Sequence, residues 1–292
     1  MHLMNEEWYV RNTVLLILIH NQDQRRLRSV RPTVEAVTEK LKSSGSDVTA
    51  IEVAHQDWIY SIYRTRLALL RRKILVIYGT GLLLRRYRSS RRAQVGNLLR
   101  GIWQSLKILA SRSSAENFLR RTRVETSLSH KHHLAWRLAV EYQASSCLVL
   151  EDDVIPSPTF DDLSGFAALM RRRSRLGVRL ADSIADKETP LARLADVESG
   201  SCFLNQVVTN GTCAYWIDTS ILKYWLRDCY LHPWILDLPA DWLIESLEHF
   251  RLKGQAVKVL RNETGSFLVP AAKPLIHGSG CGVFVSEIQV PD

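Results

Sequence analysis

The chain has 292 residues, of which 46% are hydrophobic and 24% charged, and this composition excludes a generally disordered protein. The length allows one large domain or two small ones. Its five cysteines are scattered and contain no CxxC pair, which favours reduced thiols over a disulfide framework or a zinc site. The first residues, "MHLMNEEWYVRN", lack the features of a secretory signal, so we expect a cytoplasmic protein.

Positive charge is concentrated in one segment, residues 58–123. This segment holds sixteen Lys and Arg residues and one acidic residue, a net charge of +15. The whole chain has a net charge of +9, so the rest of the chain sums to −6. The basic character therefore belongs to the segment and not to the protein as a whole.

The first predicted elements form a βαβ unit. Residues 13–20, "TVLLILIH", are a continuous apolar run of the kind found in buried parallel strands. Residues 30–42 carry valine and leucine at helical spacing and are followed by a Ser-Ser-Gly turn. Residues 47–54, "DVTAIEVA", read as a second strand. Short connections between these elements predict a parallel sheet.

After the basic segment the pattern resumes with a predicted helix over 127–143 and a strand over 147–150. Ligands of open α/β sheets bind beyond the carboxyl ends of the strands, where Glu151, Asp152 and Asp153 follow. One interpretation is a polar turn before the prolines that come next. The other is a binding site for Mn²⁺ or Mg²⁺, since both cations take oxygen ligands.

The remaining chain predicts further elements in a less regular pattern. Residues 160–198 look helical and polar with loops, and 205–218 read as a strand that runs into a turn. Residues 238–254, "LPADWLIESLEHFRLKG", read as a loop that opens a helix. A short apolar strand follows within 266–269, and His277 then stands alone before a glycine-rich stretch.

Four motifs in a fixed order, "SLSHKHHLAW", "CLVLEDDV", "GTCAYWID" and "LPADWLIE", resemble glycosyltransferase family 25, the lipopolysaccharide-type β-glycosyltransferases. The resemblance implies a GT-A fold, which is a Rossmann-like α/β/α sandwich with a mostly parallel sheet. It also implies a nucleotide-diphosphate-sugar donor such as a UDP-sugar, a Mn²⁺ or Mg²⁺ cofactor, and inverting transfer to a hydroxyl of a glycan or lipid-linked acceptor. Such activity would belong to lipopolysaccharide biosynthesis.

The resemblance covers roughly residues 13–55 and 122–282. It leaves the basic segment as a helical insertion, residues 58–123, within a single glycosyltransferase domain that spans 1–292.

Several donor-binding residues follow from the resemblance. Asn21 and Arg25, or its neighbour Arg26, match positions near the nucleotide, although a basic helix start is an equal alternative. Ser129 and His130 match a Ser-His pair that precedes a helix, where a serine is also an ordinary N-cap. The sequence "TRVETS" stands upstream where the family has a glycine-containing turn. The neighbouring His132 and His133 are expected to be solvated.

The acidic triplet matches the metal and ribose region of the family. Asp153 is then the metal ligand, while Glu151 and Asp152 contact the ribose or order the site. His277 is a further candidate metal ligand, since a C-terminal histidine completes the metal site in several GT-A enzymes.

Asp241, in "LPADWLIE", matches the family's Asp before Trp. Inverting transfer needs a general base that takes the proton of the acceptor hydroxyl, and the resemblance gives Asp241 this role. A plain N-cap is the alternative, because Asp before an apolar helical run is a preferred cap.

The basic segment has three interpretations. Apolar residues at helical spacing with arginine and lysine between them suit an interfacial helix on an anionic membrane, here the inner face. An ordinary amphipathic helix packed on the domain is equally consistent. Nucleic-acid binding ranks last, because the segment has positive charge and aromatic residues but no recognised module. A non-catalytic basic binding module for nucleic acid or membrane is therefore the alternative to an enzyme.

Overall fold

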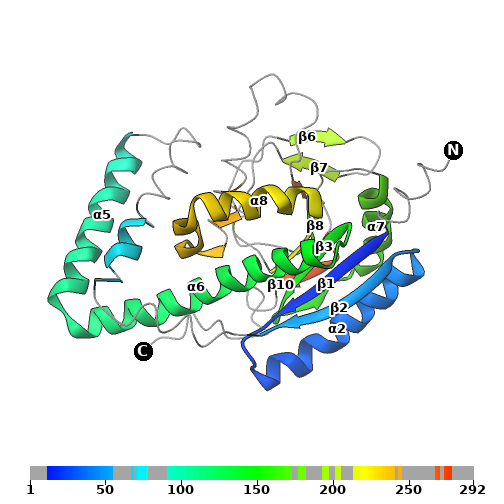
Figure 1. Cartoon of the computed structure of the whole chain (residues 1–292), viewed down its shortest axis with the longest axis horizontal. Coiled ribbons are helices and arrows are strands. Elements are labelled where there is room, and N and C mark those ends of the chain that lie inside the picture. Colours follow the sequence, from blue (N-terminus) through cyan, green and yellow to red (C-terminus); the bar gives the residue numbers. More distant parts are fainter. Residues whose placement is uncertain are drawn as a thin grey trace.

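The computed structural model shows a central sheet with helices on both of its faces and a helical arm to one side (Figure 1). It describes residues 12–54, 67–68, 70–75, 77, 91–172, 177–181, 193–196, 201–204, 213–240, 243–244, 247, 267–269 and 273–277. The predicted base Asp241 and the glycines after His277 lie outside the described residues. So does most of residues 74–84, an apolar run within the basic segment.

The sheet is mixed, and within the described residues its strand order is β2-β1-β3-β8-β5-β9-β7-β6. The strands are β1 (Thr13–Ile19), β2 (Asp47–Val53), β3 (Ser146–Glu151), β5 (Gly177–Arg179), β6 (Arg193–Asp196), β7 (Ser201–Leu204), β8 (Ala214–Asp218) and β9 (Phe267–Val269). Strands β2, β1 and β3 run parallel, whereas β8 is antiparallel to both of its neighbours, β3 and β5. The predicted α/β class is confirmed, and the sheet is parallel across β2-β1-β3 and between β5 and β9, while its other pairs are antiparallel.

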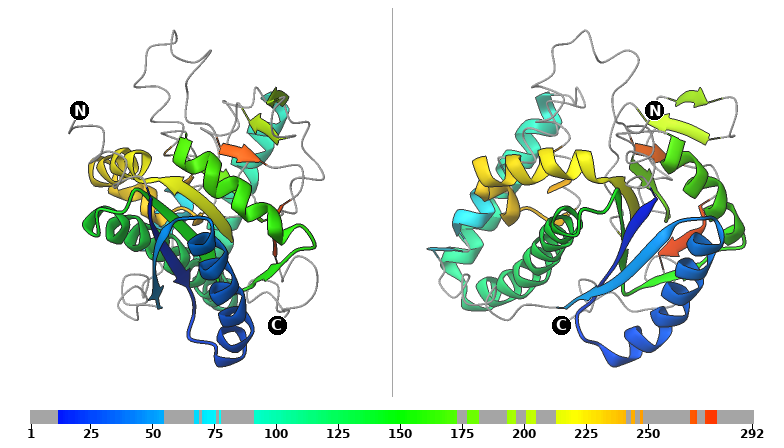
Figure 2. Two further views of the ribbon diagram at one scale, coloured as in Figure 1. Left: turned by 90° about the vertical axis from the view of Figure 1, so that its right-hand side faces the viewer. Right: turned by 45° about the vertical axis from the view of Figure 1, so that its right-hand side comes forward.

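Alternate residues of the central strands face two separate hydrophobic cores. In β1, Leu16 and Leu18 contribute to one core, while Leu15 and Ile17 contribute to the other. Helices α2 (Gln24–Ser43) and α7 (Leu163–Arg172) cover the first core, and α6 (Arg112–Glu141) and α8 (Thr219–Leu231) cover the second. Figure 2 shows these pairs on opposite faces of the sheet. A strand buried on both faces needs apolar side chains at every position, which explains the unbroken run in β1.

Helix α2 begins six residues before its predicted start at residue 30. The Asp23 carboxylate accepts a hydrogen bond from the Arg25 N–H (2.8 Å) and so caps the new end. Pro32 lies inside the helix. The helix ends before Gly45, whose φ of 86° suits a residue without a Cβ.

Helix α6 connects the basic segment to the rest of the domain. Helix α5 (Arg91–Ala110) packs against α6, which spans 30 residues and runs across residue 123, the predicted boundary of the insertion. Arg72 anchors the segment: its buried guanidinium donates to Thr126 Oγ1 (3.0 Å) and Glu125 Oε2 (3.1 Å) on α6. In the part of the chain that the structure describes, no helix is long and apolar enough to cross a membrane.

Several elements differ from their predictions. The segment predicted as helical with loops contains the short strands β5 and β6, and β8 leads into α8 where a turn was expected. His277 ends a three-residue strand, β10 (Leu275–His277), and does not lie in a loop. Strand β10 pairs antiparallel with β4 (Val154–Pro156), with His277 opposite Val154. The short 3₁₀ helices are η1 (Phe160–Asp162) and η3 (Pro233–Asp237).

Candidate active site

The ends of β1 and β3 bring two predicted motifs together. The parallel register places Ile19 beside Glu151, so the residues that follow each strand leave the sheet at the same edge. The Asn21 N–H donates to Asp152 Oδ2 across this edge (3.0 Å). The residues that follow β1 and the acidic triplet therefore lie next to each other at this edge.

Asp152 is buried and fixes the loop that follows β1. Besides Asn21, it accepts a hydrogen bond from Arg26 Nη1 (3.3 Å). Burial raises the pKa of Asp152 above its ordinary value, while the Asn21 N–H and the charges of Arg26 and Lys131 oppose this shift. Of the two candidate arginines it is Arg26 that reaches Asp152, whereas the Arg25 side chain is exposed. Arg25 contributes its backbone N–H to the cap of α2.

The loop after β1 has a defined shape. Gln22 has a left-handed φ of 63°, and its N–H donates to Nδ1 of the buried His20 (3.0 Å). Lys131 reaches the loop from α6, where its ammonium donates to the His20 carbonyl (3.2 Å) and to the Asn21 side-chain oxygen. The Lys131 side chain is almost fully buried, with 2% relative exposure, so its positive charge is held at the sheet edge.

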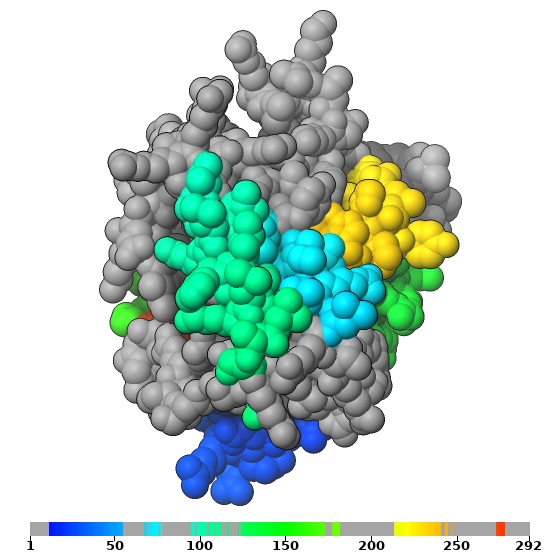
Figure 3. All heavy atoms as spheres, turned by 90° about the vertical axis from the view of Figure 1, so that its left-hand side faces the viewer, coloured from blue at the N-terminus to red at the C-terminus, as the bar shows by residue number. Residues whose placement is uncertain are grey.

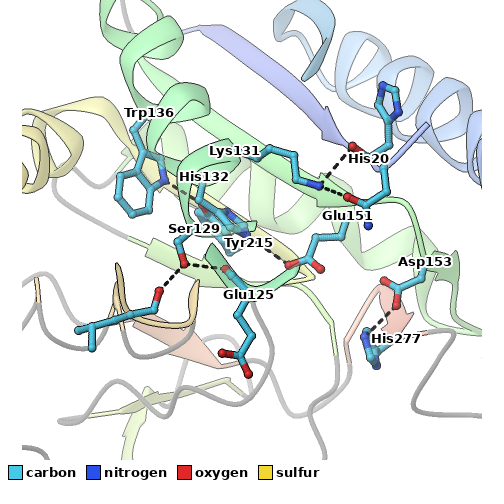
Figure 4. Close-up of polar contacts among 12 residues, drawn as sticks. His20, Glu125, Ser129, Lys131, His132, Trp136, Glu151, Asp153, Tyr215 and His277 are labelled. Atoms are coloured by element: carbon cyan, nitrogen blue, oxygen red, sulfur yellow. Dashed lines mark hydrogen bonds and ion pairs between the residues drawn. The ribbon is translucent and has the colours of Figure 1, made fainter. Parts of the chain in front are cut away.

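Glu151 ends a buried chain of hydrogen bonds that begins at Trp136 (Figure 4). The Trp136 indole N–H donates to Tyr215 Oη (2.8 Å), and Tyr215 Oη lies 2.8 Å from His132 Nδ1. His132 Nε2 lies 3.3 Å from Glu151 Oε1. His132 is fully buried, so the expectation that it is solvated was wrong.

The order of donors in this chain follows from its ends. An indole nitrogen can only donate, so Tyr215 accepts from Trp136 and directs its own proton to His132 Nδ1. Burial raises the pKa of Tyr215 well above its ordinary value, so the phenol keeps this proton. His132 then carries its proton on Nε2 and donates to Glu151. The chain thus holds the Glu151 carboxylate in one orientation.

Asp153 and His277 meet although 124 positions separate them in the sequence. His277 Nε2 lies 3.0 Å from Asp153 Oδ2, with side-chain exposures of 28% and 8% respectively. The pairing of β10 with β4 creates this contact, because His277 is opposite Val154, the residue after Asp153. The two residues predicted as metal ligands are therefore adjacent.

The donor set of this pair fits a divalent cation. Two neighbouring ligands of an octahedral ion at about 2.1 Å stand about 3 Å apart, close to the observed separation. A carboxylate with an imidazole suits Mn²⁺ better than Mg²⁺, which prefers oxygen ligands alone. In the described residues no cluster of three or more His, Cys, Asp and Glu ligands occurs. Among the described residues, Asp153 and His277 are the pair that would hold such a cation.

Ser129 and His130 lie inside α6, so the interpretation of Ser129 as an N-cap was wrong. Ser129 is buried, and its hydroxyl donates to the Leu238 carbonyl (2.5 Å), just before the predicted base Asp241. Burial lowers the pKa of His130, an effect that the nearby charge of Asp237 opposes. Both residues therefore lie close to the segment that leads to Asp241.

That segment begins a helical turn. The Leu243 N–H donates to the Pro239 carbonyl (2.8 Å), so the turn starts at Pro239, two positions before Asp241. Leu243 and Leu247 belong to the core under α6 and α8, and Ala240 is buried. Ala240 and Leu243, which stand before and after Asp241 in the sequence, are thus held in the interior.

Comparison of the sequence with protein-family models and with curated proteins finds no match.

The structure adds His20, Lys131, His132 and Tyr215 to the site. His20 precedes Asn21, and Lys131 and His132 lie within the "SLSHKHHLAW" motif. Their position next to predicted site residues in the sequence could therefore have pointed to them. Tyr215 lies in "GTCAYWID", where only its apolar strand pattern was used.

Proposed function

We propose that the chain is a metal-dependent inverting glycosyltransferase with a GT-A-like fold, which moves a sugar from a nucleotide-diphosphate-sugar to a hydroxyl. The observation that carries the proposal is the contact between Asp153 and His277 at the carboxyl edge of the parallel strands. A hard-cation ligand pair at this edge is what a diphosphate-binding site of an open α/β sheet requires.

The three adjacent acids have three different tasks in this proposal. Asp153 holds the cation together with His277. Asp152 accepts hydrogen bonds from Asn21 and Arg26 and thereby fixes the loop that would face the nucleotide. Glu151 is held by His132 and is partly exposed, so its carboxylate can accept hydrogen bonds from ribose hydroxyls.

The transfer step needs a proton acceptor on the other substrate. The acceptor oxygen forms a bond to the anomeric carbon, and the bond from that carbon to the diphosphate oxygen breaks. The hydroxyl proton passes to the Asp241 carboxylate, and the electron pair of the broken bond leaves with the nucleoside diphosphate. Ser129 supports this step by holding the Leu238 carbonyl ahead of Asp241.

A bound Mn²⁺ would neutralise negative charge on the departing diphosphate. The chain also places the positive charges of Lys131 and Arg26 near the acidic triplet, where they balance the charge of Asp152. A UDP-sugar donor, a glycan or lipid-linked acceptor and a role in lipopolysaccharide biosynthesis complete the proposal. They rest on the family resemblance.

A thermal-shift panel of nucleoside diphosphates and nucleotide sugars, with and without Mn²⁺, tests the proposal. A ligand that binds only the native state raises its stability, by about 2.7 kcal/mol at a hundred times Kd. We expect at least one nucleotide sugar to raise the Tm of the native protein, and only when Mn²⁺ is present. The same mixture should release nucleoside diphosphate when an acceptor is added.

Asp153→Asn should abolish this shift, and Asp161→Asn is its matched control. Asp161 is an exposed aspartate in the nearby η1 and pairs with Lys40 (2.6 Å). A nucleotide shift that survives in Asp153→Asn, or that is lost equally in Asp161→Asn, would remove the acidic triplet from the donor site.

A further inference from the structure

One face of α5 exposes an unusual number of large apolar side chains to solvent. Its large apolar side chains have relative exposures between 47% and 60%: Val95, Leu98, Leu99, Ile102, Trp103, Leu106 and Leu109. At about 100° per residue these positions fall within an arc of roughly 140° on one side of the helix. Figure 3 shows α5 in teal at the surface, beside the preceding segment in cyan.

A different side of α5 makes its contact with the protein. Gly101 is buried, and a Cβ at this position would lie 2.5 Å from the Ile77 side chain. Gly101 therefore allows the preceding segment to approach α5 closely. Because this contact leaves the apolar arc in solvent, the arc has no role in the core of the described protein.

Basic residues run along one margin of the apolar arc. Arg100 and Lys107 are exposed and follow each other at a spacing of seven, so they share a side of the helix. The Lys107 ammonium lies 5.5 Å from the centre of the Trp103 ring. An apolar stripe with an aromatic residue and a cationic margin is typical of a helix that lies in a membrane interface.

We infer that α5 docks this protein on an anionic lipid bilayer, with the apolar arc in the acyl boundary and the basic margin among the headgroups. Charge complementarity selects this occupant, since residues 58–123 carry a net charge of +15. The same charge opposes docking of a second copy on this face. A nucleic acid would satisfy the charge but offers no layer to bury leucine side chains. The inference does not depend on sugar transfer.

Flotation with vesicles tests the inference, using phosphatidylcholine alone and an equal mixture of phosphatidylcholine and phosphatidylglycerol. We expect the native protein to float with the anionic vesicles and not with the neutral ones. The triple variant Leu99→Ser, Trp103→Ser, Leu106→Ser should bind at least about tenfold more weakly, because three apolar side chains leave the bilayer. Replacing Arg100 and Lys107 by Gln should weaken binding about fivefold per charge, and high salt should remove this difference.

The control replaces exposed apolar residues of α8, Tyr230→Ser and Leu231→Ser, and should float like the native protein. The inference is overturned if the native protein ignores anionic vesicles, binds neutral ones equally, or floats unchanged after the triple substitution. Analytical ultracentrifugation supplies a further contradicting result, in which the triple substitution converts a native dimer to a monomer and the face belongs to a second copy. Nucleotide binding, measured without vesicles, should be the same in all of these variants, which separates failure of the docking face from failure of the donor site.

Discussion

The edge of the sheet and the face of α5 depart from an ordinary protein surface in opposite directions. At the sheet edge, the charged groups of Lys131, Asp152 and Asp153 are buried, whereas on α5 large apolar side chains such as Trp103 are exposed. Burying charge is costly unless the groups are paired, and exposing an apolar stripe is costly unless something covers it. In our proposals the first region binds a charged ligand, and the second contacts the apolar layer of a membrane.

The two regions should therefore respond to substitution in different assays. Asp241→Asn should lower turnover by about 10² to 10⁴, because general-base catalysis contributes a factor of this size. Donor and Mn²⁺ binding should remain. Trp103→Ser, on α5, should leave turnover with a soluble acceptor unchanged. The measurement is release of nucleoside diphosphate beside donor binding.

Near-normal turnover in Asp241→Asn would reduce the residue to a local structural role, and lost donor binding would assign it to the metal site. Near-normal turnover would also contradict the proposal that catalysis takes place at the edge of the sheet.

Arg72 should stabilise the attachment of the basic segment to α6. Arg72 is buried and donates to Thr126 and Glu125, so Arg72→Met should cost about 2 to 3 kcal/mol of unfolding free energy, because both groups lose a hydrogen bond. Arg137→Met is the control, because its ion pair with Glu141 on the same helix is exposed and contributes about 0.5 kcal/mol or less. Urea denaturation measures both. Equal losses in the two variants would mean that the basic segment is not anchored through Arg72.

The hydrogen bonds that connect Trp136 to Glu151 provide a further test of the site at the sheet edge. Tyr215→Phe removes the hydroxyl between Trp136 and His132 and should cost about 2 kcal/mol, because two buried polar groups lose a partner. The KM for the donor should rise more than kcat falls, since the chain orients a binding group. Tyr230→Phe, at a tyrosine with 85% exposure, should change neither stability nor kinetics. An unchanged KM in Tyr215→Phe would leave the chain with a structural role alone.

The smallest expected effect is a pH dependence of stability from α6. Burial lowers the pKa of His133 from 6.5 to about 4, so the unfolded chain takes up the proton first as the pH falls. This contribution is complete above pH 6.5 and is lost between 6.5 and about 4. Allowing for its partial exposure, we expect about 1 to 2 kcal/mol. His133→Gln should reduce the loss of stability between pH 7 and pH 4 by this amount, and an unchanged pH profile would contradict it.

The strongest sequence signals were those with a local cause. The apolar run of β1 and the strand before Glu151 were predicted correctly, because burial on both faces leaves an unbroken pattern. Helix α8 was missed although Ile221, Leu222 and Trp225 recur at helical spacing, so that signal was present. The short strands β5 and β6 carry too few residues to show a period.

The site shows the same division between local and distant causes. The position of Glu151, Asp152 and Asp153 at a strand end followed from the sequence. The choice of Arg26 over Arg25 depends on which side of α2 faces Asp152, and the predicted helix began after both residues. The contact of Asp153 with His277 depends on the register of two three-residue strands, which no local pattern encodes. Only the family resemblance suggested it.

Pulsed electron paramagnetic resonance of Mn²⁺ bound with a nucleotide sugar tests the central claim most directly. The account predicts nitrogen coupling to the manganese in the native protein, since His277 supplies an imidazole ligand beside Asp153. The coupling should vanish in His277→Gln and persist in His133→Gln, which changes a histidine on α6. Manganese that binds with nucleotide but shows no nitrogen coupling, or coupling that survives in His277→Gln, would contradict the proposed metal site.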